Sequence, residues 1–254
     1  MLTVLGAGIT AAVVPMISNA VSSGAAKIST GTGLTSPGAP FSWTVALDNN
    51  AVLNGCHSWT FPEPITKIPF YDVGTGTHSL AQDETWALDH GGIDDENAAF
   101  DITLQGKTDE DVVIRNLRVK VLSRKEPVRG TGISSGMGCG SNLDVRHYSV
   151  DLSAPSPQLV LDNADGSTAP PDAQYTVSKS DPEVFCLEAY EGTIMAQHYD
   201  ETYVYEVDWS QGSQSGTVDI SAPDGQPFEL DYPPSDDRIY VASNGMWKDA
   251  ATIQ

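Results

Sequence analysis

Residues 203–209 read Tyr-Val-Tyr-Glu-Val-Asp-Trp, and residues 117–121 read Leu-Arg-Val-Lys-Val. Apolar and charged side chains alternate in both stretches. Successive side chains of a strand point to opposite faces, so each stretch has one apolar face and one charged face. This pattern predicts half-buried strands, and it places the aromatic side chains of residues 203–209 in a core rather than on a surface that stacks on sugars.

The same alternation recurs along the chain in short segments separated by Gly, Pro, Asn or Asp. The further predicted strands are residues 41–47, 58–61, 99–104, 112–122, 143–152, 158–161, 175–177, 184–190, 216–220 and 228–230. Many short strands at this spacing are typical of antiparallel sandwiches. One helix is predicted over residues 80–90, begun by Ser79 and ended by Gly91-Gly92.

Residues 2–21 carry no charge and are long enough for a helix of roughly 30 Å, the thickness of a hydrocarbon core. We predict a transmembrane anchor within residues 1–26. A secretory signal peptide would need a basic flank, which is absent. Residues 6–11 match a dinucleotide fingerprint, but no second strand ending in an acid follows at the required distance. A helix packed against other subunits remains a further alternative.

The predicted layout continues with a Ser/Gly/Pro linker over residues 27–40. A Pro-bearing stretch at residues 153–157 divides the remainder into a first sandwich, residues 41–154, and a second, acidic sandwich, residues 155–254. Each part is long enough to form its own core. The predicted fold class is therefore all-β: two tandem antiparallel immunoglobulin-like β-sandwich domains after a single N-terminal apolar helix.

The charge of the chain is strongly negative. It has 34 Asp and Glu residues against 13 Lys and Arg residues, a formal net charge of −21. Such a surface repels phosphate backbones, so nucleic-acid binding through a basic face is excluded. Six bases nevertheless cluster on one strand and the loop after it: Arg115, Arg118, Lys120, Arg124, Lys125 and Arg129. They predict either self-association with an acidic neighbour or, as we favour, an intramolecular match to acids on adjacent strands.

Several features together resemble a known group of proteins. These are the apolar N-terminal segment, the Ser/Pro linker, the turn Gly55-Cys56-His57-Ser58-Trp59, the Val-rich residues 112–122, and Asp-Pro-Glu-Val-Phe at residues 181–185. They resemble uncharacterised membrane-anchored β-rich proteins of actinobacteria. The resemblance implies an anchor followed by a β-rich body. It implies no activity and no catalytic residues.

The chain has three cysteines, and two of them lie in Gly-containing turns. We predict a disulfide between these two, Cys56 and Cys139, and a buried position for the mid-strand Cys186. A disulfide implies an oxidising compartment, which agrees with export.

Residues 132–136 match the G-x-S-x-G pattern, in which a strand turns sharply into a helix and exposes the serine. The Gly-rich residues that follow are poor helix formers, so we interpret this stretch as a surface loop. Cys56 and His57 have no ligand pair at zinc-site spacing, and no metal site is predicted.

Carboxylates cluster at four places, which we interpret as solvated turns: Asp94-Asp95-Glu96, Asp109-Glu110-Asp111, Asp162 with Asp165, and Asp236-Asp237. None matches an EF-hand loop, and calcium binding at these turns is kept as an alternative. No cofactor and no catalytic residue is assigned.

The sequence thus predicts a membrane-anchored extracellular binding or structural protein without catalytic activity, located at the cell membrane. Its expected partners are the membrane, through residues 2–21, and a protein or a second copy of itself. One alternative is a secreted or anchored hydrolase of glycans or esters that uses Ser134 with His147 or His198, or scattered carboxylates. Another is a filament or shell subunit assembled through the N-terminal helix.

Overall fold

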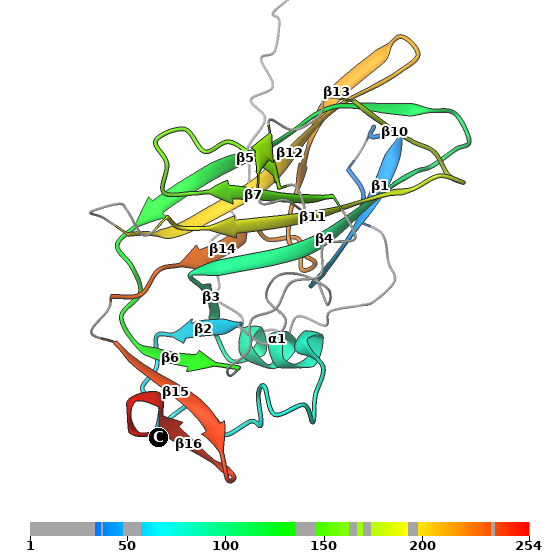
Figure 1. The fold of residues 1–254 in the computed structure, drawn as a ribbon. Helices are drawn as coiled ribbons and strands as arrows, with labels where there is room; N and C mark the ends of the chain where they lie inside the picture. The colour runs from blue at the N-terminus through cyan, green and yellow to red at the C-terminus, as the bar shows by residue number, and fades with distance from the viewer. Residues whose placement is uncertain are drawn as a thin grey trace, which may run out of the picture.

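The structure is a computed structural model that describes most of the chain after residue 33. The described residues are 34–36, 38–47, 57–135, 146–162, 167–169, 174–192, 198–234 and 237–253. Within them, two β-sheets carry sixteen strands and are accompanied by one α-helix and one short 3-10 helix, η1 (Ala250–Thr252). The all-β prediction is confirmed at this level (Figure 1).

The first sheet has six strands. Their order is β1 (Phe41–Leu47), β4 (Asn97–Gly106), β11 (Glu183–Tyr190), β7 (His147–Asp151), β8 (Val160–Asp162) and β9 (Thr168–Ala169). All neighbours are antiparallel except β11 and β7, which are parallel.

The second sheet has ten strands. Nine follow one order: β10 (Tyr175–Val177), β5 (Val112–Lys125), β12 (Asp200–Gln211), β14 (Phe228–Asp231), β3 (Ile93–Asp95), β2 (Ser58–Phe61), β6 (Thr131–Ser134), β15 (Arg238–Ser243) and β16 (Met246–Asp249). The tenth, β13 (Gln214–Ile220), pairs with β12. Two pairs in this sheet, β14 with β3 and β15 with β6, are parallel.

The six-stranded sheet packs on the β10–β5–β12–β14 part of the larger sheet, and the apolar faces between them form what we call the two-sheet core. Phe100 of β4 and Phe228 of β14 meet across it with ring centroids 4.9 Å apart. Tyr203, Tyr205 and Val207 of β12 are fully buried there. The alternation in residues 203–209 therefore predicted the core face correctly.

The helix α1 (Leu80–Asp89) covers the β2–β6 end of the larger sheet (Figure 1). It begins where predicted and ends at Asp89, one residue before the predicted end. The Ser79 N–H donates to the Gln82 side chain at the start, and the chain turns at Gly91, whose φ is +81°, after the end. The apolar cluster under it, which we call the helix core, centres on Trp86. Phe61, Tyr71 and Trp247 all have ring centroids within 5.8 Å of the Trp86 ring.

The boundary near residue 155 does not separate two domains. β4 pairs with β11, and β5 pairs with β12 over most of their length, so strands from before and after residue 155 are direct neighbours in both sheets. The prediction of two tandem, wholly antiparallel units is thus corrected to one interleaved pair of sheets with mixed pairing. Alternation identifies strands, but it carries no information on which distant strand pairs with which.

The predicted anchor, residues 1–26, lies outside the described residues. None of the described helices is long and apolar enough to cross a membrane.

Candidate functional site

Three titratable side chains from separate elements meet under α1. In the β2–β3 register Trp59 lies opposite Asp94, so these two side chains share a face of the sheet. His57 precedes Trp59 by two residues and points to the same face. The helix α1 lies over this face and contributes Glu84 from its middle. We call His57, Glu84 and Asp94 the buried triad.

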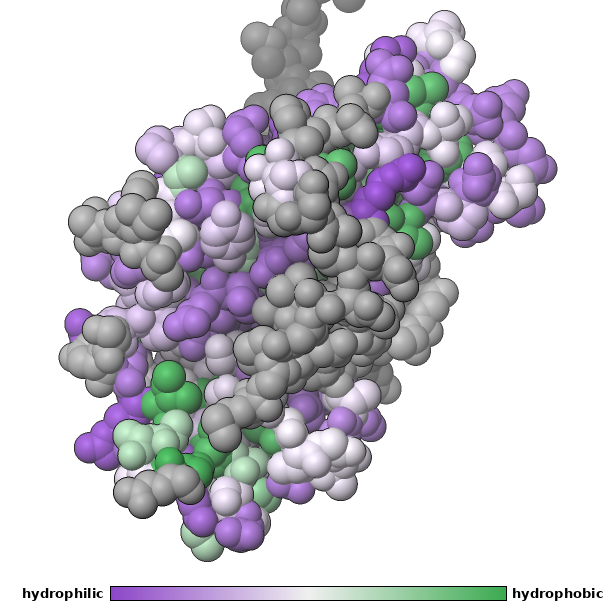
Figure 2. Space-filling model, viewed as in Figure 1, coloured by the Kyte–Doolittle hydropathy of each residue, from purple (hydrophilic) through white to green (hydrophobic). Residues whose placement is uncertain are grey.

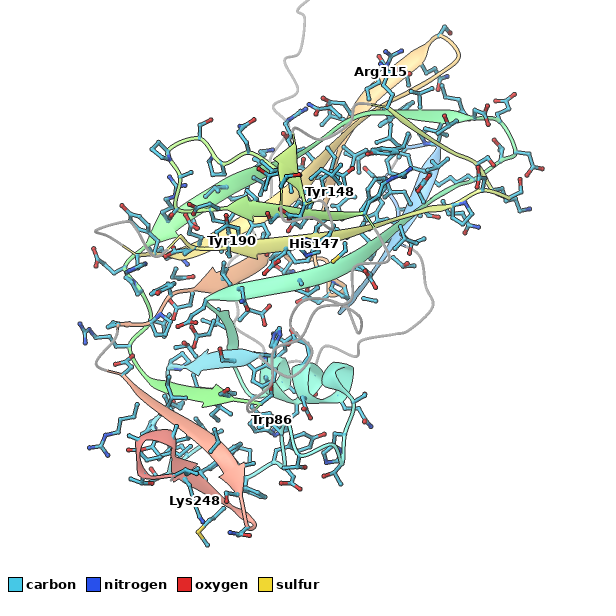
Figure 3. All side chains as sticks on the ribbon, viewed as in Figure 1. Trp86, Arg115, His147, Tyr148, Tyr190 and Lys248 are labelled. Atoms are coloured by element: carbon cyan, nitrogen blue, oxygen red, sulfur yellow. The ribbon has the colours of Figure 1, made fainter. Side chains whose placement is uncertain are left out.

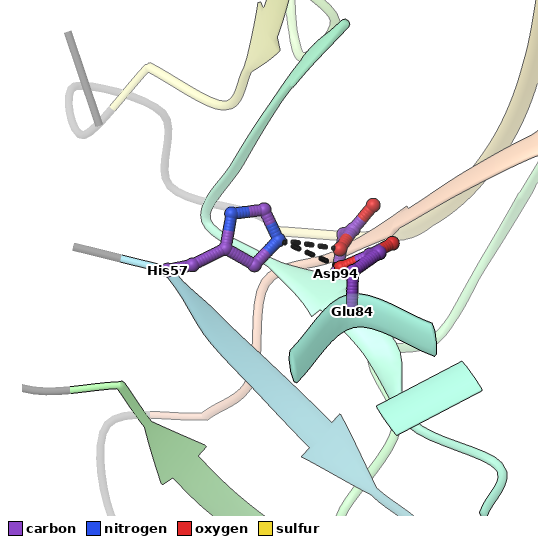
Figure 4. A group of neighbouring side chains, drawn as sticks. All are labelled: His57, Glu84 and Asp94. Carbon is purple, nitrogen blue, oxygen red and sulfur yellow. Dashed lines mark hydrogen bonds and ion pairs between the residues drawn. The ribbon is translucent and has the colours of Figure 1, made fainter. Parts of the chain in front are cut away.

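The triad is compact and enclosed. The Nε2 atom of His57 lies 2.9 Å from Oδ1 of Asp94 and 3.2 Å from Oε2 of Glu84. Figure 4 shows both contacts ending on the same ring nitrogen. The side chains of His57, Glu84 and Asp94 are 3%, 4% and 6% exposed. Three polar groups are therefore held together where water cannot solvate them.

Neighbouring groups fix the orientation of the triad. The indole N–H of Trp59 donates to Oε2 of Glu84 over 2.8 Å. The backbone N–H of His57 donates to Oγ of Ser135 over 3.0 Å, and the backbone N–H of Ser135 donates to the carbonyl oxygen of His57 over 2.8 Å. Ser135 thus holds the backbone of His57, and Trp59 holds the carboxylate of Glu84.

Burial and charge shift the pKa values of the triad in a coupled way. Burial alone would lower the pKa of His57, but hydrogen bonds to Asp94 and Glu84 and their negative charges raise it from 6.5 to about 10. Burial and the charge of Glu84 raise the pKa of Asp94 from 3.8 to about 7, against the opposing effect of His57. With both carboxylates ionised, the site holds one more negative charge than the imidazolium balances.

A second histidine gives a contrast. Nδ1 of His147 lies 3.0 Å from Oδ2 of Asp162, and its Nε2 lies 3.2 Å from Oε2 of Glu188. Each ring nitrogen therefore faces one carboxylate. Burial would lower the pKa of His147, but Glu188 and Asp162 outweigh it and raise the pKa. Figure 3 places His147 in the six-stranded sheet, apart from Trp86 and the helix core.

The groups of the hydrolase alternative lie on separate elements. Ser134 ends β6 of the larger sheet, whereas His147 begins β7 of the smaller one. Nδ1 of His198 contacts Glu191 at 3.0 Å. The interpretation of residues 132–136 as a surface loop is wrong for its described part: residues 132–134 belong to β6, which pairs with β2 and β15, and Ser135 is buried.

The six clustered bases between Arg115 and Arg129, which we call the basic stripe, interact with groups of the same chain. Arg118 contacts Glu206 at 2.8 Å and also binds Asp208, while Lys120 lies 3.2 Å from both Glu206 and Asp219. These acids belong to β12 and β13. The other bases are placed as follows: Arg124 contacts Glu201, Lys125 contacts Asp200, Arg115 donates to Ser210, and Arg129 lies between β5 and β6. The stripe therefore has the intramolecular match that we favoured, and self-association through it stays a prediction.

The predicted disulfide partners, Cys56 and Cys139, lie outside the described residues. His57, which follows Cys56, and Ser135, which lies four residues before Cys139, are described and are hydrogen-bonded to each other. The disulfide stays a prediction that non-reducing peptide mapping checks. Cys186 is buried in β11 against Ala99, as expected.

The carboxylate clusters differ in their burial. Asp109, Glu110 and Asp111 are exposed, as the interpretation of a solvated turn requires. Asp94 and Asp95 are instead buried in β3, so that interpretation is wrong for them. Asp95 lies opposite Asp231 of β14, on the sheet face away from the triad. Burial and the charges of neighbouring acids raise the pKa of Asp95 to about 8.

The sequence offered one signal for the triad. In α1, Glu84 lies four residues after Leu80 and three before Ala87, so a charged residue occupies the apolar stripe of the helix. The convergence of this stripe with His57 and Asp94 depends on tertiary packing and had no signal.

In the comparisons with known proteins, no family model, no curated protein and no solved structure matched this chain.

Proposed function

We propose that this chain is a membrane-anchored binding or structural protein without catalytic activity, whose β body is displayed outside the membrane. The observation that carries the proposal is how three histidine side chains are held by carboxylates. His57 and His147 are buried and face two carboxylates each, and His198 faces Glu191. The side chains of His57 and His147 are only 3% and 5% exposed, so a substrate cannot reach their ring nitrogens in this fold.

The layout of the chain supports display. An apolar segment, residues 2–21, precedes a Ser/Gly/Pro linker, and a folded body of two sheets follows. We further propose that this body works as immunoglobulin-like modules do. It is a rigid β scaffold that presents one face to a partner.

The face that we assign to a protein partner lies at the C-terminal hairpin, which is formed by β15 and β16. Figure 2 shows hydrophobic side chains gathered where Figure 1 draws β6 and β15. Ile239 of β15 is 48% exposed, and Met246 of β16 is 55% exposed. Exposed apolar patches of this kind are typical of protein-binding surfaces.

Fractionation of cells that express the full chain tests the proposal. We expect the intact chain in the membrane fraction, released by detergent but not by high salt, and its body degraded when protease is added outside intact cells. A control variant that lacks residues 2–21 is expected in the soluble fraction. Recovery of the intact full chain from the soluble cytosol would overturn the proposal. Sedimentation as a large particle in detergent would favour the assembled-shell alternative.

A further inference from the structure

The buried triad differs from an ordinary buried histidine in where its carboxylates lie. An imidazolium ring carries one N–H on each nitrogen, so it serves two carboxylates best when each faces a different nitrogen. His147 has that arrangement, with Asp162 at Nδ1 and Glu188 at Nε2. At His57 both carboxylates face Nε2 (Figure 4). A ring nitrogen and two carboxylate oxygens that converge in this way form the donor set of a cation.

The distances fit a small ion. Nitrogen and oxygen ligands lie about 2.0–2.2 Å from Zn²⁺, so two ligands of one ion are about 2.9–3.6 Å apart in octahedral or tetrahedral geometry. The two measured separations from Nε2 are 2.9 Å to Asp94 and 3.2 Å to Glu84. All three ligand atoms lie within 4.8 Å of one another. One central ion can therefore contact all three.

The charges of the triad balance with a divalent cation. A neutral imidazole and two carboxylates sum to −2, which a divalent cation brings to zero. Without the metal, an imidazolium between two ionised carboxylates leaves −1 among side chains that are no more than 6% exposed. Uncompensated charge is costly in such surroundings, so neutrality favours the metal-bound form.

The donor types select the class of metal. Ca²⁺ and Mg²⁺ prefer oxygen ligands alone, whereas a histidine nitrogen with two carboxylates suits Zn²⁺ and other first-row transition metals. The carboxylate of Glu84 also accepts a hydrogen bond from the indole N–H of Trp59, as ligating carboxylates do in metal sites. We propose that His57, Glu84 and Asp94 bind one divalent transition-metal cation, which joins α1 to β2 and β3.

The proposal is independent of membrane anchoring and is tested on the full chain in detergent, purified without chelator and without a histidine tag. The metal content of the wild-type protein is measured first. The metal is then removed with a chelator, and Zn²⁺ is titrated back while binding and thermal unfolding are followed. We expect about one Zn²⁺ per chain, a higher Tm with Zn²⁺, and no displacement of Zn²⁺ by excess Ca²⁺ or Mg²⁺.

Variants locate the ion. Glu84→Gln and Asp94→Asn keep the shape of each side chain but remove a charged ligand, and each is expected to weaken Zn²⁺ binding at least tenfold, on the order of the loss for even an outer contact. His147→Gln is the matched control, because His147 is also buried between two carboxylates. It is expected to bind Zn²⁺ as the wild type does. Circular dichroism of each metal-free variant shows whether it is folded.

A readout that does not depend on stability is the ligand-field absorption of Co²⁺ bound in place of Zn²⁺. It should appear in the wild type and in His147→Gln, and it should change in Glu84→Gln. The proposal is overturned if the folded wild type binds neither Zn²⁺ nor Co²⁺. It is also overturned if binding is unchanged in both triad variants, or if Ca²⁺ displaces Zn²⁺.

Discussion

The two-sheet core and the helix core are built on opposite principles. In the two-sheet core, apolar faces of β4, β11, β12 and β14 meet, and on the outer face of the larger sheet Arg118 and Lys120 of β5 pair with acids of β12 and β13. In the helix core, the aromatic cluster around Trp86 adjoins the buried triad, so charge lies inside. The first region is stabilised by apolar burial, whereas the second also needs every buried charge compensated.

The largest expected effect is in the two-sheet core. Phe185 of β11 is buried and lies against the rings of Tyr148 and Tyr175. Phe185→Ala should lower the free energy of unfolding by about 3–5 kcal/mol, because it removes apolar contacts and leaves a cavity. Urea denaturation measures the loss. Leu122→Ala, at an exposed position of β5, should cost about 0.5 kcal/mol or less. Similar losses at both positions would mean that the two sheets are not packed as described.

The helix core should be destabilised by a substitution at Gly74, because Gly74 packs closely against the backbone of Ser135. The φ of Gly74 is +69°, and a Cβ added there would lie 1.3 Å from the carbonyl oxygen of Ser135, the residue that holds His57. Gly74→Ala should therefore cost about 2–4 kcal/mol, from the positive φ and the steric overlap together. Gly76 has a similar φ of +79° but open space around it. Gly76→Ala should show only the cost of φ, about 1–2 kcal/mol.

Thermal unfolding of the Gly74→Ala and Gly76→Ala variants separates the cost of the positive φ from the cost of the steric overlap. Equal losses would show that the contact between Gly74 and Ser135 contributes nothing.

The sequence predicted the two-sheet core better than the helix core, for a physical reason. Alternation reports burial of one face, so residues 41–47 and 175–177 of the two-sheet core were predicted with their observed bounds. β6 was missed because Gly132 within it, with Gly130 before it and Gly136 after it, resembles a loop. A Cβ on Gly130, just before β6, would lie 1.9 Å from the carbonyl oxygen of Phe61, so close backbone approach accounts for that glycine.

The candidate site was not predicted because its parts are far apart in the chain. A histidine beside Trp59, an acid on a helix stripe and an acid pair at residues 94–95 are each ordinary features. Only the pairing of β2 with β3, and the packing of α1 on both, brings them together. Partner choice between strands depends on the whole fold, and periodicity does not record it.

The free energy of unfolding should depend on pH through Asp231. Asp231 of β14 is fully buried, and burial and the charge of Asp200 raise its pKa from 3.8 to about 6, although the Val128 N–H lowers it. The native state therefore holds this proton more tightly than the unfolded state. Its contribution to stability, up to roughly 3 kcal/mol, is complete below about pH 4 and is lost as the pH rises through about 6.

Asp231→Asn keeps an oxygen to accept from Val128 and removes the titrating proton. It should make the fall of the unfolding free energy between about pH 4 and 6 less steep, measured by urea denaturation at a series of pH values. The remaining fall comes from Asp94 and Asp95, whose pKa values are also raised. Asp109→Asn, at an exposed acid, is the control and should leave the profile unchanged. A wild-type stability that rises over this pH range would contradict the assignment to Asp231.

The smallest effect is expected on the outer face of the two-sheet core. Arg118 and Glu206 lie opposite each other in the β5–β12 register, with their charged atoms 2.8 Å apart, and the Arg118 side chain is 38% exposed. Water and the loss of side-chain freedom offset most of the attraction, so a double-mutant cycle of Arg118→Gln and Glu206→Gln should give a coupling of only about 0.2–1 kcal/mol. The coupling should shrink further as salt is raised, because salt screens exposed charges. A coupling several times larger and insensitive to salt would mean that this face is shielded from water by a partner. That outcome would move the binding surface from the C-terminal hairpin to the basic stripe.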